Sequence, residues 1–364
     1  MHVYIEKILN CAVLCIYLRT IWLVVISILY EFTMPWIVWG MMIVMIGVKL
    51  ARVPPPHPSI VQEVLGIDPF VSDTQTTNDV DHKSQGNGDG YCMRVVAHRG
   101  GGYDYPENSL SAFRNCKEKG CTAVELDISL TKDNVPIVFH DATIERLAGR
   151  EGTVRDMTWE EIKEIDIAYT HPLRDKFGSS ERILLLDDAI GICLQNGQHI
   201  IMDLKEKGPV MVQTILDFFS KYPELLRRAV VSSFDPIVVY MIRRKEPRIV
   251  CSLAWRPQYF SRQAYLGLDG PALPRFDNPL KHLMACLMDC IYGWAFPRFV
   301  YYIVGVSAVL LHKDMINPKV ICQWKARGVR VMAWSVNQPS EKIHFSRRLR
   351  VTYLTDTLLA EKIS

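Results

Sequence analysis

The sequence lacks the patterns that would assign it to several common classes of protein. Its ten cysteines include no Cys-x-x-Cys pair and no Cys/His spacing suited to zinc, so neither a redox motif nor a zinc site is predicted. A net charge of +3 over 364 residues gives no strongly basic character, and we expect no nucleic-acid partner. No Asn-x-Ser/Thr acceptor occurs, so glycosylation gives no information about the compartment.

Long apolar stretches are also scarce, and the main one covers residues 8–48, where Arg19, Glu31 and Pro35 interrupt it. About 20 apolar residues suffice for a helix to cross a bilayer. We therefore predict that residues 1–52 form a membrane-anchoring segment. Two arrangements fit: a single span with an interfacial helix, or a helical hairpin that breaks near Glu31. A buried pair of helices is the alternative without a membrane.

The charges that flank this segment bear on its topology. Lys7 precedes the apolar stretch, and Lys49 and Arg52 follow it. Because cytoplasmic flanks are enriched in basic residues, a hairpin would place the rest of the chain in the cytoplasm, whereas a single span leaves the side open. We expect an integral protein of the plasma membrane or an endomembrane, with the lipid bilayer as a partner.

The remaining sequence is divided into a linker and one large domain. Residues 53–92 contain a run of three prolines and then a polar stretch, and they are interpreted as a linker with little capacity to pack. The large domain is expected over residues 93–364. It contains an apolar insertion near residues 256–303, which is either a membrane-dipping helix or an insertion packed on the core.

Within residues 93–364, short β-branched runs alternate with amphipathic stretches long enough to form helices. Repeated β-then-α units argue for a parallel sheet, and the length suits an eight-fold TIM barrel of the α/β class. A doubly wound open sheet is the alternative. The candidate strands are Val95–Ala97, Ala123–Ile128, Ile137–Phe139, Ile200–Leu204, Val230–Ser233, Ile249–Ala254, Ser307–Leu311, Val329–Trp334 and Val351–Leu354.

This set contains one strand more than such a barrel needs. Too few residues separate the second candidate from the third for a parallel crossover, which takes a dozen or more. The Lys-Asp-Asn sequence at residues 132–134 is typical of a hairpin turn. We therefore predict that residues 128–139 form a β-hairpin on the end of the second strand, and that its return arm brings His140 beside Asp127.

Acidic residues lie at the ends of two predicted strands. Glu125 and Asp127 are two residues apart, so both side chains point to the same face of an otherwise apolar strand, and Asp203 ends another. Barrel active sites form at such strand ends. Buried carboxylates on one face repel each other unless a cation lies between them. A divalent cation with oxygen ligands, Mg²⁺ first and Ca²⁺ as the alternative, is predicted here; ordinary ion pairs are the simpler explanation.

Basic residues and histidines occur at the same strand ends. Lys205 shares a face with Asp203, and His98-Arg99 leads from the first strand into three glycines, while His140 ends the hairpin arm. A guanidinium can fork onto phosphate, and a histidine moves protons near neutral pH. Phosphodiester cleavage needs this combination: positive charge for the phosphate, one group to activate the nucleophile, and another to protonate the leaving alkoxide.

The order of these residues resembles the glycerophosphodiester phosphodiesterase family, and in particular its membrane-bound branch, whose members include glycerophosphoinositol hydrolases. The motifs in the first half of the domain are the more specific ones. The matching segments are Val95–Gly100, Pro106–Ser109, Ala123–Asp127, Thr131–Asp133, Val138–Asp141, Asp203–Lys205, Ser232–Phe234, Ala333–Asn337 and Leu354–Asp356.

The resemblance implies a barrel of the phospholipase C-like phosphodiesterase type and gives roles to the residues at its strand ends. Two departures stand out: many family members have Glu in place of Asp203, and the family's final Asp-Gly motif is reduced here to Val-Thr-Tyr-Leu at residues 351–354. The implied metal ligands are Glu125, Asp127 and Asp203, the implied acid–base pair is His98 and His140, and the implied substrate contacts are Arg99 and Lys205 for phosphate and Trp334 for glycerol.

The function implied is metal-dependent hydrolysis of glycerophosphodiesters, such as glycerophosphoinositol, to glycerol 3-phosphate and an alcohol. A lysophospholipase D-type hydrolysis of single-chain lysophospholipids at the same site is the enzymatic alternative. An inactive membrane-anchored scaffold is a third hypothesis, against which the intact set of histidines, acids and lysine argues.

Overall fold

The N-terminal unit, Met1–Arg52, is built from one long helix. In the computed structural model α1 runs from His2 to Ala51 without a break, so the hairpin that was one of the two predicted arrangements is wrong. Pro35 does not end the helix, because a proline removes one backbone hydrogen bond and the neighbouring turns keep theirs. The structure describes residues 2–70, 91–176, 181–266 and 270–359.

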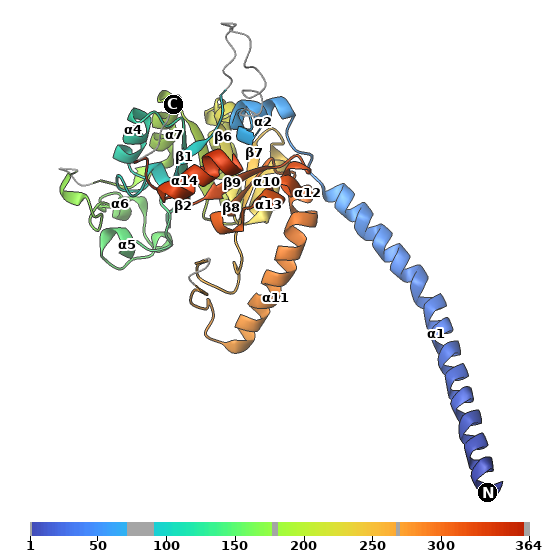
Figure 1. Ribbon diagram of the computed structural model, residues 1–364. Helices are drawn as coiled ribbons and strands as arrows, with labels where there is room; N and C mark the ends of the chain where they lie inside the picture. Colours follow the sequence, from blue (N-terminus) through green and yellow to red (C-terminus); the bar gives the residue numbers. More distant parts are fainter. Residues whose placement is uncertain (1, 71–90, 177–180, 267–269, 360–364) are drawn as a thin grey trace. The chain divides into compact units, whose positions relative to one another are not determined.

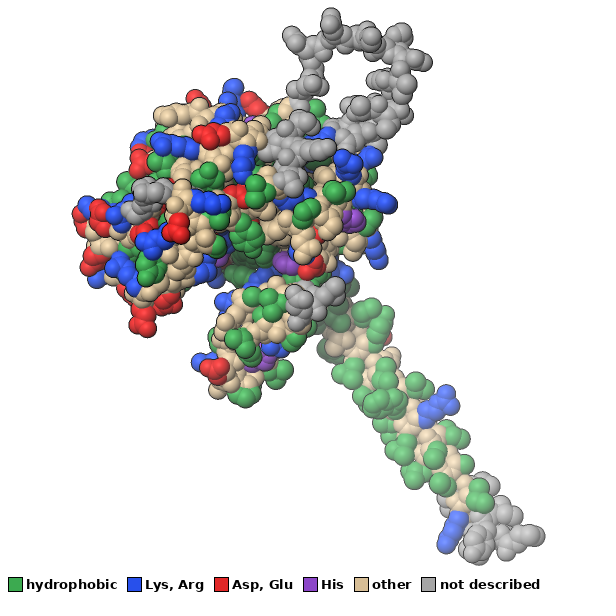
Figure 2. Space-filling model, turned by 60° about the vertical axis from the view of Figure 1, so that its left-hand side comes forward, with side chains coloured by type: hydrophobic (Ala, Val, Ile, Leu, Met, Phe, Trp, Pro, Cys, Tyr) green, Lys and Arg blue, Asp and Glu red, His purple; other side chains and the backbone are tan. Residues whose placement is uncertain are grey.

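The described surface of α1 is dominated by apolar side chains. Its segment Cys11–Ala51 is long and apolar enough to cross a bilayer; an 18-residue stretch of it has a mean hydropathy of 2.3, and none of that stretch is buried. Figure 2 shows hydrophobic side chains along this helix and few charged ones. At about 1.5 Å per residue its 50 residues extend about 75 Å, against about 30 Å for the hydrocarbon core of a bilayer. α1 is therefore longer than a single crossing requires.

The described part of the second unit, from Val53 onward, is an eight-stranded parallel barrel with helices around it, as predicted (Figure 1). Successive barrel strands pair side by side, and β1 closes the ring by pairing with both β10 and β2. This closure excludes the doubly wound open sheet. The barrel strands are β1 (Val95–Ala97), β2 (Ala123–Leu130), β5 (His199–Leu204), β6 (Ala229–Ser233), β7 (Val250–Trp255), β8 (Ala308–His312), β9 (Arg330–Trp334) and β10 (Thr352–Thr355).

Helices connect the strands and cover the outside of the barrel (Figure 1). Several begin at a side chain that caps the first turn: Ser109, Asp235 and Asn317 each accept a hydrogen bond from a backbone amide of the helix that follows. The helices of this unit in the described ranges are α2 (Pro58–Leu65), α4 (Leu110–Glu118), α5 (Glu145–Ala148), α6 (Trp159–Ile162), α7 (Leu186–Gln195), α8 (Pro209–Lys221), α9 (Leu225–Arg228), α10 (Pro236–Lys245), α11 (Pro279–Ala295), α12 (Tyr301–Val304), α13 (Pro318–Lys325) and α14 (Pro339–Ile343).

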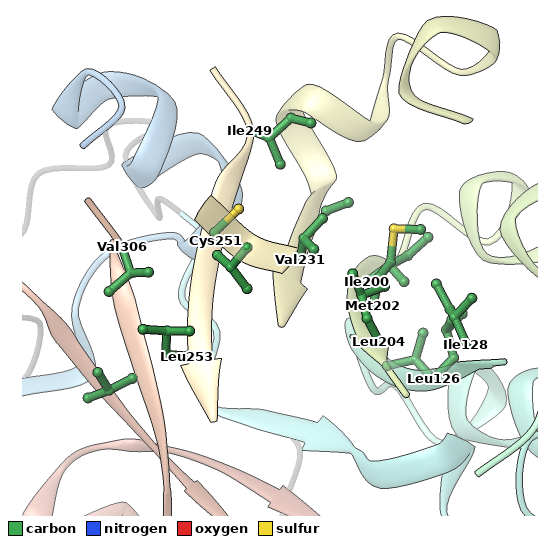
Figure 3. Packing of buried hydrophobic residues seen from close by; sticks show 14 of the residues in the cluster. Leu126, Ile128, Ile200, Met202, Leu204, Val231, Ile249, Cys251, Leu253 and Val306 are labelled. Atoms are coloured by element: carbon green, nitrogen blue, oxygen red, sulfur yellow. The ribbon is translucent and has the colours of Figure 1, made fainter. Parts of the chain in front are cut away.

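The side chains on the two faces of β2 have different tasks: the outer ones pack against helices, and the inner ones carry the chemical groups. On β2, Leu126 and Ile128 point outward and pack with Met202 of β5 in the layer between strands and helices (Figure 3). Each such side chain, once buried, stabilises the fold by about 1.5–3 kcal/mol. Because successive side chains alternate, Glu125 and Asp127 on the same strand point into the barrel.

The end of β2 continues as one arm of a hairpin, as predicted. It pairs antiparallel with β3 (Pro136–Val138). The amide of Phe139 donates to the carbonyl of Asp127 at 3.0 Å, which carries His140 back to the acidic strand end. A short strand that was not predicted, β4 (Leu184–Leu185), pairs with the other edge of β3; two residues are too few to show an alternating pattern.

The amino ends of the barrel strands are closed by α2, which comes from the segment predicted as a linker. Val64 and Leu65 are fully buried among inward-pointing side chains of the barrel strands, and Arg330 donates to the carbonyl of Leu65 at 2.7 Å. The structure thus differs from the predicted linker, residues 53–92, in its first part, because a short helix with two buried apolar residues is enough to close a barrel. Residues 71–90 lie outside the described residues.

The insertion between β7 and β8 packs on the barrel through its C-terminal part. Phe296 is buried, and its ring centroid lies 5.8 Å from that of Trp255 and 5.6 Å from that of Trp324. α11 projects away from the barrel (Figure 1), and most of its apolar side chains are exposed. The core-packed arrangement therefore holds for the end of the insertion, and α11 itself is largely uncovered.

Candidate active site

Three carboxylates meet inside the barrel at the carboxyl ends of two neighbouring strands. Glu125 and Asp127 lie on β2 and Asp203 on β5, where the parallel register pairs Asp127 directly with Asp203. One oxygen of each carboxylate lies within 4.8 Å of the others, and all three residues are buried. The structure thus brings together the acids that the sequence grouped.

Two cations and a hydrogen-bonding amide surround the central acid, Asp127. Lys205 Nζ lies 2.7 Å from Asp127 Oδ1 and 2.6 Å from Asp203 Oδ2, and Arg99 Nε lies 3.3 Å from Asp127 Oδ2. Asn108 Nδ2 donates to the same Asp127 oxygen at 2.8 Å. Burial by itself raises the pKa of Asp127, but Lys205 and Arg99 hold this pKa well below its usual range. Asp127 is therefore ionised at neutral pH.

Glu125 is in the opposite electrostatic state. Burial, and then the charge of Asp127, raise the pKa of Glu125 to about 8. Nearby, Asp203 Oδ1 is buried without a hydrogen-bond partner among the described residues. A divalent cation would relieve both conditions, since it favours ionised carboxylates and gives the orphaned oxygen a ligand bond. Three carboxylates are also a hard oxygen donor set, which suits Mg²⁺ or Ca²⁺.

A tight turn after β1 positions Arg99. Its φ of 54° lies in the left-handed region, and Gly100 follows with φ 79°. A Cβ on Gly100 would lie 2.8 Å from that of Ala112, so the turn packs closely on α4 and needs glycine there. The turn directs the amide of Arg99 to Glu125 Oε2 at 2.9 Å, and its Nη1 to Glu107 Oε1 at 2.9 Å. The guanidinium is thereby fixed at the edge of the acidic group.

His98 is oriented by a residue near the far end of the chain. Its Nδ1 lies 2.5 Å from Asp356 Oδ1, and Asn337 donates to the other Asp356 oxygen at 2.7 Å. The Nε2 atom faces Glu125 Oε2 at 3.8 Å. Burial opposes protonation, but the carboxylates of Asp356 and Glu125 raise the pKa of His98 above its ordinary value. His98 is thus set up to carry a proton.

His140 has a similar arrangement of partners and the opposite shift. Its Nδ1 lies 2.6 Å from Asp141 Oδ1, and Arg146 donates to the other Asp141 oxygen at 2.6 Å. Burial lowers the pKa of His140, and nearby Lys205 contributes in the same direction. Two titratable groups with pKa values moved apart are characteristic of an acid–base pair. His98 is suited to be the acid and His140 the base.

These side chains line one cavity of about 530 Å³ at the carboxyl ends of the strands. One wall is charged, and the other is aromatic: Trp334 meets Phe234 edge to face at 6.0 Å and His312 at 4.9 Å between ring centroids. Trp334 Nε1 is buried without a hydrogen-bond partner in the described ranges. A cavity with cations on one side and an apolar wall with a spare N–H on the other suits a small amphiphilic phosphoester.

All the predicted site residues come together here. Asp127 is buried behind the others, which line the cavity directly. The roles assigned to them stay predictions. The sequence analysis missed the residues that orient this set. For Asn337 and Asp356 the usable signal is a polar residue soon after a strand, and for Glu107 and Asn108 it is only their place in a matching segment; Arg146 had no signal. The missed residues are Glu107, Asn108, Arg146, Asn337 and Asp356.

Comparisons with known proteins agree with the family resemblance seen in the sequence. A sequence model of the glycerophosphoryl diester phosphodiesterase family matches residues 98–356. The chain is 34% identical over 269 residues to glycerophosphodiester phosphodiesterase 1 of Homo sapiens, covering 74% of this chain and 79% of that protein. It is 24% identical over 256 residues to lysophospholipase D GDPD3 of Mus musculus, with coverages of 69% and 75%. An Oleispira antarctica phosphodiesterase, solved with the product sn-glycerol-3-phosphate, shares the fold with a TM-score of 0.53 at 19% identity, over 72% of this chain and 92% of that chain.

Proposed function

Because this chain belongs to the glycerophosphoryl diester phosphodiesterase family, we propose that it hydrolyses glycerophosphodiesters, such as glycerophosphoinositol, to glycerol 3-phosphate and an alcohol. The observation that carries this proposal is the convergence of three acids, two cations and two oppositely shifted histidines at one cavity, which all of them line except Asp127, buried directly behind. Each of these groups has a task in phosphodiester cleavage.

The phosphate is held by positive charge. Glu125, Asp127 and Asp203 would hold a divalent cation, Mg²⁺ first and Ca²⁺ as the alternative; when bound, it would polarise the phosphoryl oxygens and stabilise the charge that develops on them. Arg99 and Lys205 add cationic donors at the edge of this group. Arg99 is suited to a forked contact with two phosphate oxygens.

The two histidines move the protons. Neutral His140 takes a proton through Nε2 from the nucleophile, which is water or, in a cyclising route, the glycerol 2-hydroxyl. The cyclising route first forms a cyclic phosphate, and water must then open this ring to give glycerol 3-phosphate. As the new P–O bond forms and the bond to the alcohol breaks, His98 gives its Nε2 proton to the departing oxygen. Asp356 and Asp141, each on an Nδ1 atom, fix the tautomer and the direction of both rings.

The aromatic wall binds the rest of the substrate. Trp334 and Phe234 line the cavity opposite the cations, where they would pack against the carbon backbone of glycerol. The unpaired Nε1–H of Trp334 is available to a substrate hydroxyl. A substrate without this hydroxyl would leave a buried donor unpaired, which gives the site a means of selection.

We propose further that α1 anchors the chain as an integral protein of the plasma membrane or an endomembrane. Its apolar surface supports this, and so do its hydroxyls: Thr20 donates to the carbonyl of Ile16 at 2.9 Å and Thr33 to that of Leu29 at 2.7 Å, so these polar groups are satisfied within the helix. The test is extraction of cell membranes with alkaline carbonate, which should leave the full chain in the pellet. Release into the supernatant would contradict an integral anchor.

A lysophospholipase D-type activity is the second candidate, with single-chain lysophospholipids as substrates. It is favoured by the relative of that name and by an apolar groove of about 690 Å³ near the cavity, lined in part by Tyr259 and Phe276. The ring of Tyr259 stacks on that of Phe234 in the cavity wall, with centroids 5.1 Å apart. An acyl chain would leave the cavity on this side.

The deciding experiment is hydrolysis by the full chain in detergent, with Mg²⁺, with Ca²⁺ and with chelator. Glycerophosphoinositol and a lysophospholipid are compared as substrates, beside Glu125→Ala. Metal-dependent release of glycerol 3-phosphate that disappears in the variant would support the proposal. Release from the lysophospholipid alone would support the second candidate, and no release from either substrate under any condition would favour the inactive scaffold.

A further inference from the structure

α11 carries an apolar stripe that the described part of the chain leaves uncovered. Its members recur at intervals of three and four residues, so they lie on one face of the helix. Each is between 44% and 69% exposed. We call this stripe the α11 face, and it consists of Leu280, Leu283, Met284, Leu287, Met288, Ile291 and Trp294.

Such a continuous stripe calls for a partner. Single exposed apolar side chains are common on soluble proteins, but contiguous apolar patches rimmed by polar groups mark interaction sites. The loop before α11 adds Leu273 and Phe276, which are 71% and 38% exposed. Tyr292 and Phe296, through which the insertion packs on the core of the barrel, are not members of this stripe.

Positive charge lies along one side of the α11 face. The groove beside it, lined by Met284 and Met288, is also lined by Lys207, Arg275 and Lys281. An apolar stripe with basic residues at its edge is complementary to a bilayer surface that contains anionic lipids.

The acid on α11 does not oppose this charge pattern. Asp289 is turned toward the preceding loop, where its two carboxylate oxygens accept the amides of Phe260 at 2.8 Å and Ser261 at 3.0 Å. It therefore ties the loop to the helix and presents little negative charge outward. The same bond fixes the orientation of α11 relative to the loop that lines the groove.

The geometry favours a helix that lies on a membrane over one that crosses it. Pro279–Val304 has the length for a span, but an 18-residue stretch of it has a mean hydropathy of only 1.2, against 2.3 for such a stretch of Cys11–Ala51. Phe296 and Val304 are buried against the barrel, so a crossing would require this packing to be lost. An interfacial helix keeps the packing and buries the apolar face about 5–10 Å deep.

We propose that the α11 face docks on the surface of a bilayer containing anionic lipids, as a membrane contact separate from α1. The groove beside the α11 face is separated from the active-site cavity by the stacked rings of Tyr259 and Phe234. Docking therefore holds the entrance to the catalytic cavity close to the lipid surface. This contact does not depend on which phosphodiester is cleaved.

The test is tryptophan quenching in the full chain, reconstituted in phosphatidylcholine nanodiscs with and without phosphatidylserine. Lipids brominated on the acyl chain quench only tryptophans that enter the bilayer. The difference between the unmodified chain and Trp294→Phe gives the signal of Trp294. The same comparison with Trp159→Phe gives the signal of a control tryptophan on the barrel, and with Trp22→Phe the signal of a tryptophan on α1. We expect Trp294 to be quenched at least twofold more than Trp159, and Lys281→Glu with Arg275→Glu to reduce this in the phosphatidylserine discs.

The outcomes separate the occupants of the face and the two membrane contacts. Quenching of Trp22 without quenching of Trp294 would overturn the proposal and leave the α1 anchor standing. A Trp294 blue shift that grows with protein concentration in detergent, and no quenching in nanodiscs, would instead assign the face to a second copy and overturn the proposal. Met288→Glu should abolish the Trp294 quenching while leaving Tm in detergent unchanged, which distinguishes lost docking from lost folding.

Discussion

The two ends of the barrel are built from the same strands and yet differ in almost every physical respect. At the carboxyl ends, three buried acids crowd together, the pKa of Glu125 is raised to about 8, and Arg99 takes a left-handed backbone. At the amino ends, α2 inserts Val64 and Leu65 as a fully buried plug, and Arg330 caps the end of that helix.

The contrast shows that the amino ends of the strands contribute mainly to stability and that the carboxyl ends carry the reactive groups. Repelling charges and unusual backbone cost free energy, and they persist only where the surrounding structure fixes them. The apolar plug and the layer between strands and helices provide that support. Substitutions at the carboxyl end should therefore change turnover more than stability, and those at the amino end should do the reverse.

The largest expected effect is the loss of a proton carrier at the carboxyl end. His140→Gln removes the proposed base, and we expect kcat for glycerophosphoinositol to fall about 10²–10⁴-fold. Because His140 is partly exposed, Tm should change little. Activity within tenfold of the unmodified chain would rule out the role of His140 as the base.

The next effect concerns the acid with the raised pKa. Glu125→Gln should lower kcat about 10²–10³-fold, the usual cost of losing one electrostatic contribution to the transition state. The same substitution should increase stability at neutral and higher pH, where Glu125 ionises. Since the folded pKa of about 8 exceeds the ordinary 4.5, the folded state holds its proton longer, and ionising Glu125 destabilises it as pH rises between these values.

Urea unfolding with chelator present measures this second response. The free energy of unfolding of the unmodified chain should fall relative to that of Glu125→Gln as pH rises toward about 8. Added Mg²⁺ should stabilise the unmodified chain and not the variant. A difference between the two proteins that stays constant across the pH range would show that Glu125 is not the strained group.

At the amino end, Leu65→Ala should leave a cavity and destabilise the fold by about 2–5 kcal/mol. Turnover per folded molecule should be unchanged, because Leu65 lies at the closed end. Val210→Ala, at an exposed position of α8, is the matched control and should shift stability by no more than about 0.5 kcal/mol. If Leu65→Ala lowered kcat with little change in stability, the proposed division between the two ends would be mistaken.

The smallest effect is expected from a positioning residue. Asp356→Asn keeps the shape of the His98 partner but removes its charge, and we expect a loss of about 10–100-fold in kcat. Because the charge of Asp356 raises the pKa of His98, this pKa should be lower in the variant. The alkaline limb of the pH–rate profile should therefore shift to lower pH. A lower rate with an unmoved profile would mean that Asp356 acts only through structure.

Much of the site was predictable because it depends on local periodicity. The spacing of Glu125 and Asp127 places both on one face of a strand, whatever the strand packs against. The hairpin after β2 was recognised from a connection too short for a parallel crossover, and this alone put His140 beside the acids. The excess of candidate strands was resolved in the same way.

Other features could not be predicted because they arise from contacts between distant segments. α2 is short and follows three prolines in a mostly polar stretch; although Ile60, Val61, Val64 and Leu65 are spaced to share one face, only their packing against the inner faces of the strands shows that the helix belongs to the barrel. Arg146 contacts Glu107 and Asp141 from a separate helix, and no sequence pattern near Arg146 predicts these contacts.

The sequence by itself determined which segments form the barrel strands, which of their residues point inward, and which chemical groups stand at the strand ends. The tertiary structure decided that His98 and Asp356, 258 positions apart, form one pair, and that the two histidines differ in pKa. The reason is physical: side-chain alternation is set by the backbone of each strand, whereas a pKa depends on burial and on charges a few ångströms away, which closure of the barrel brings together.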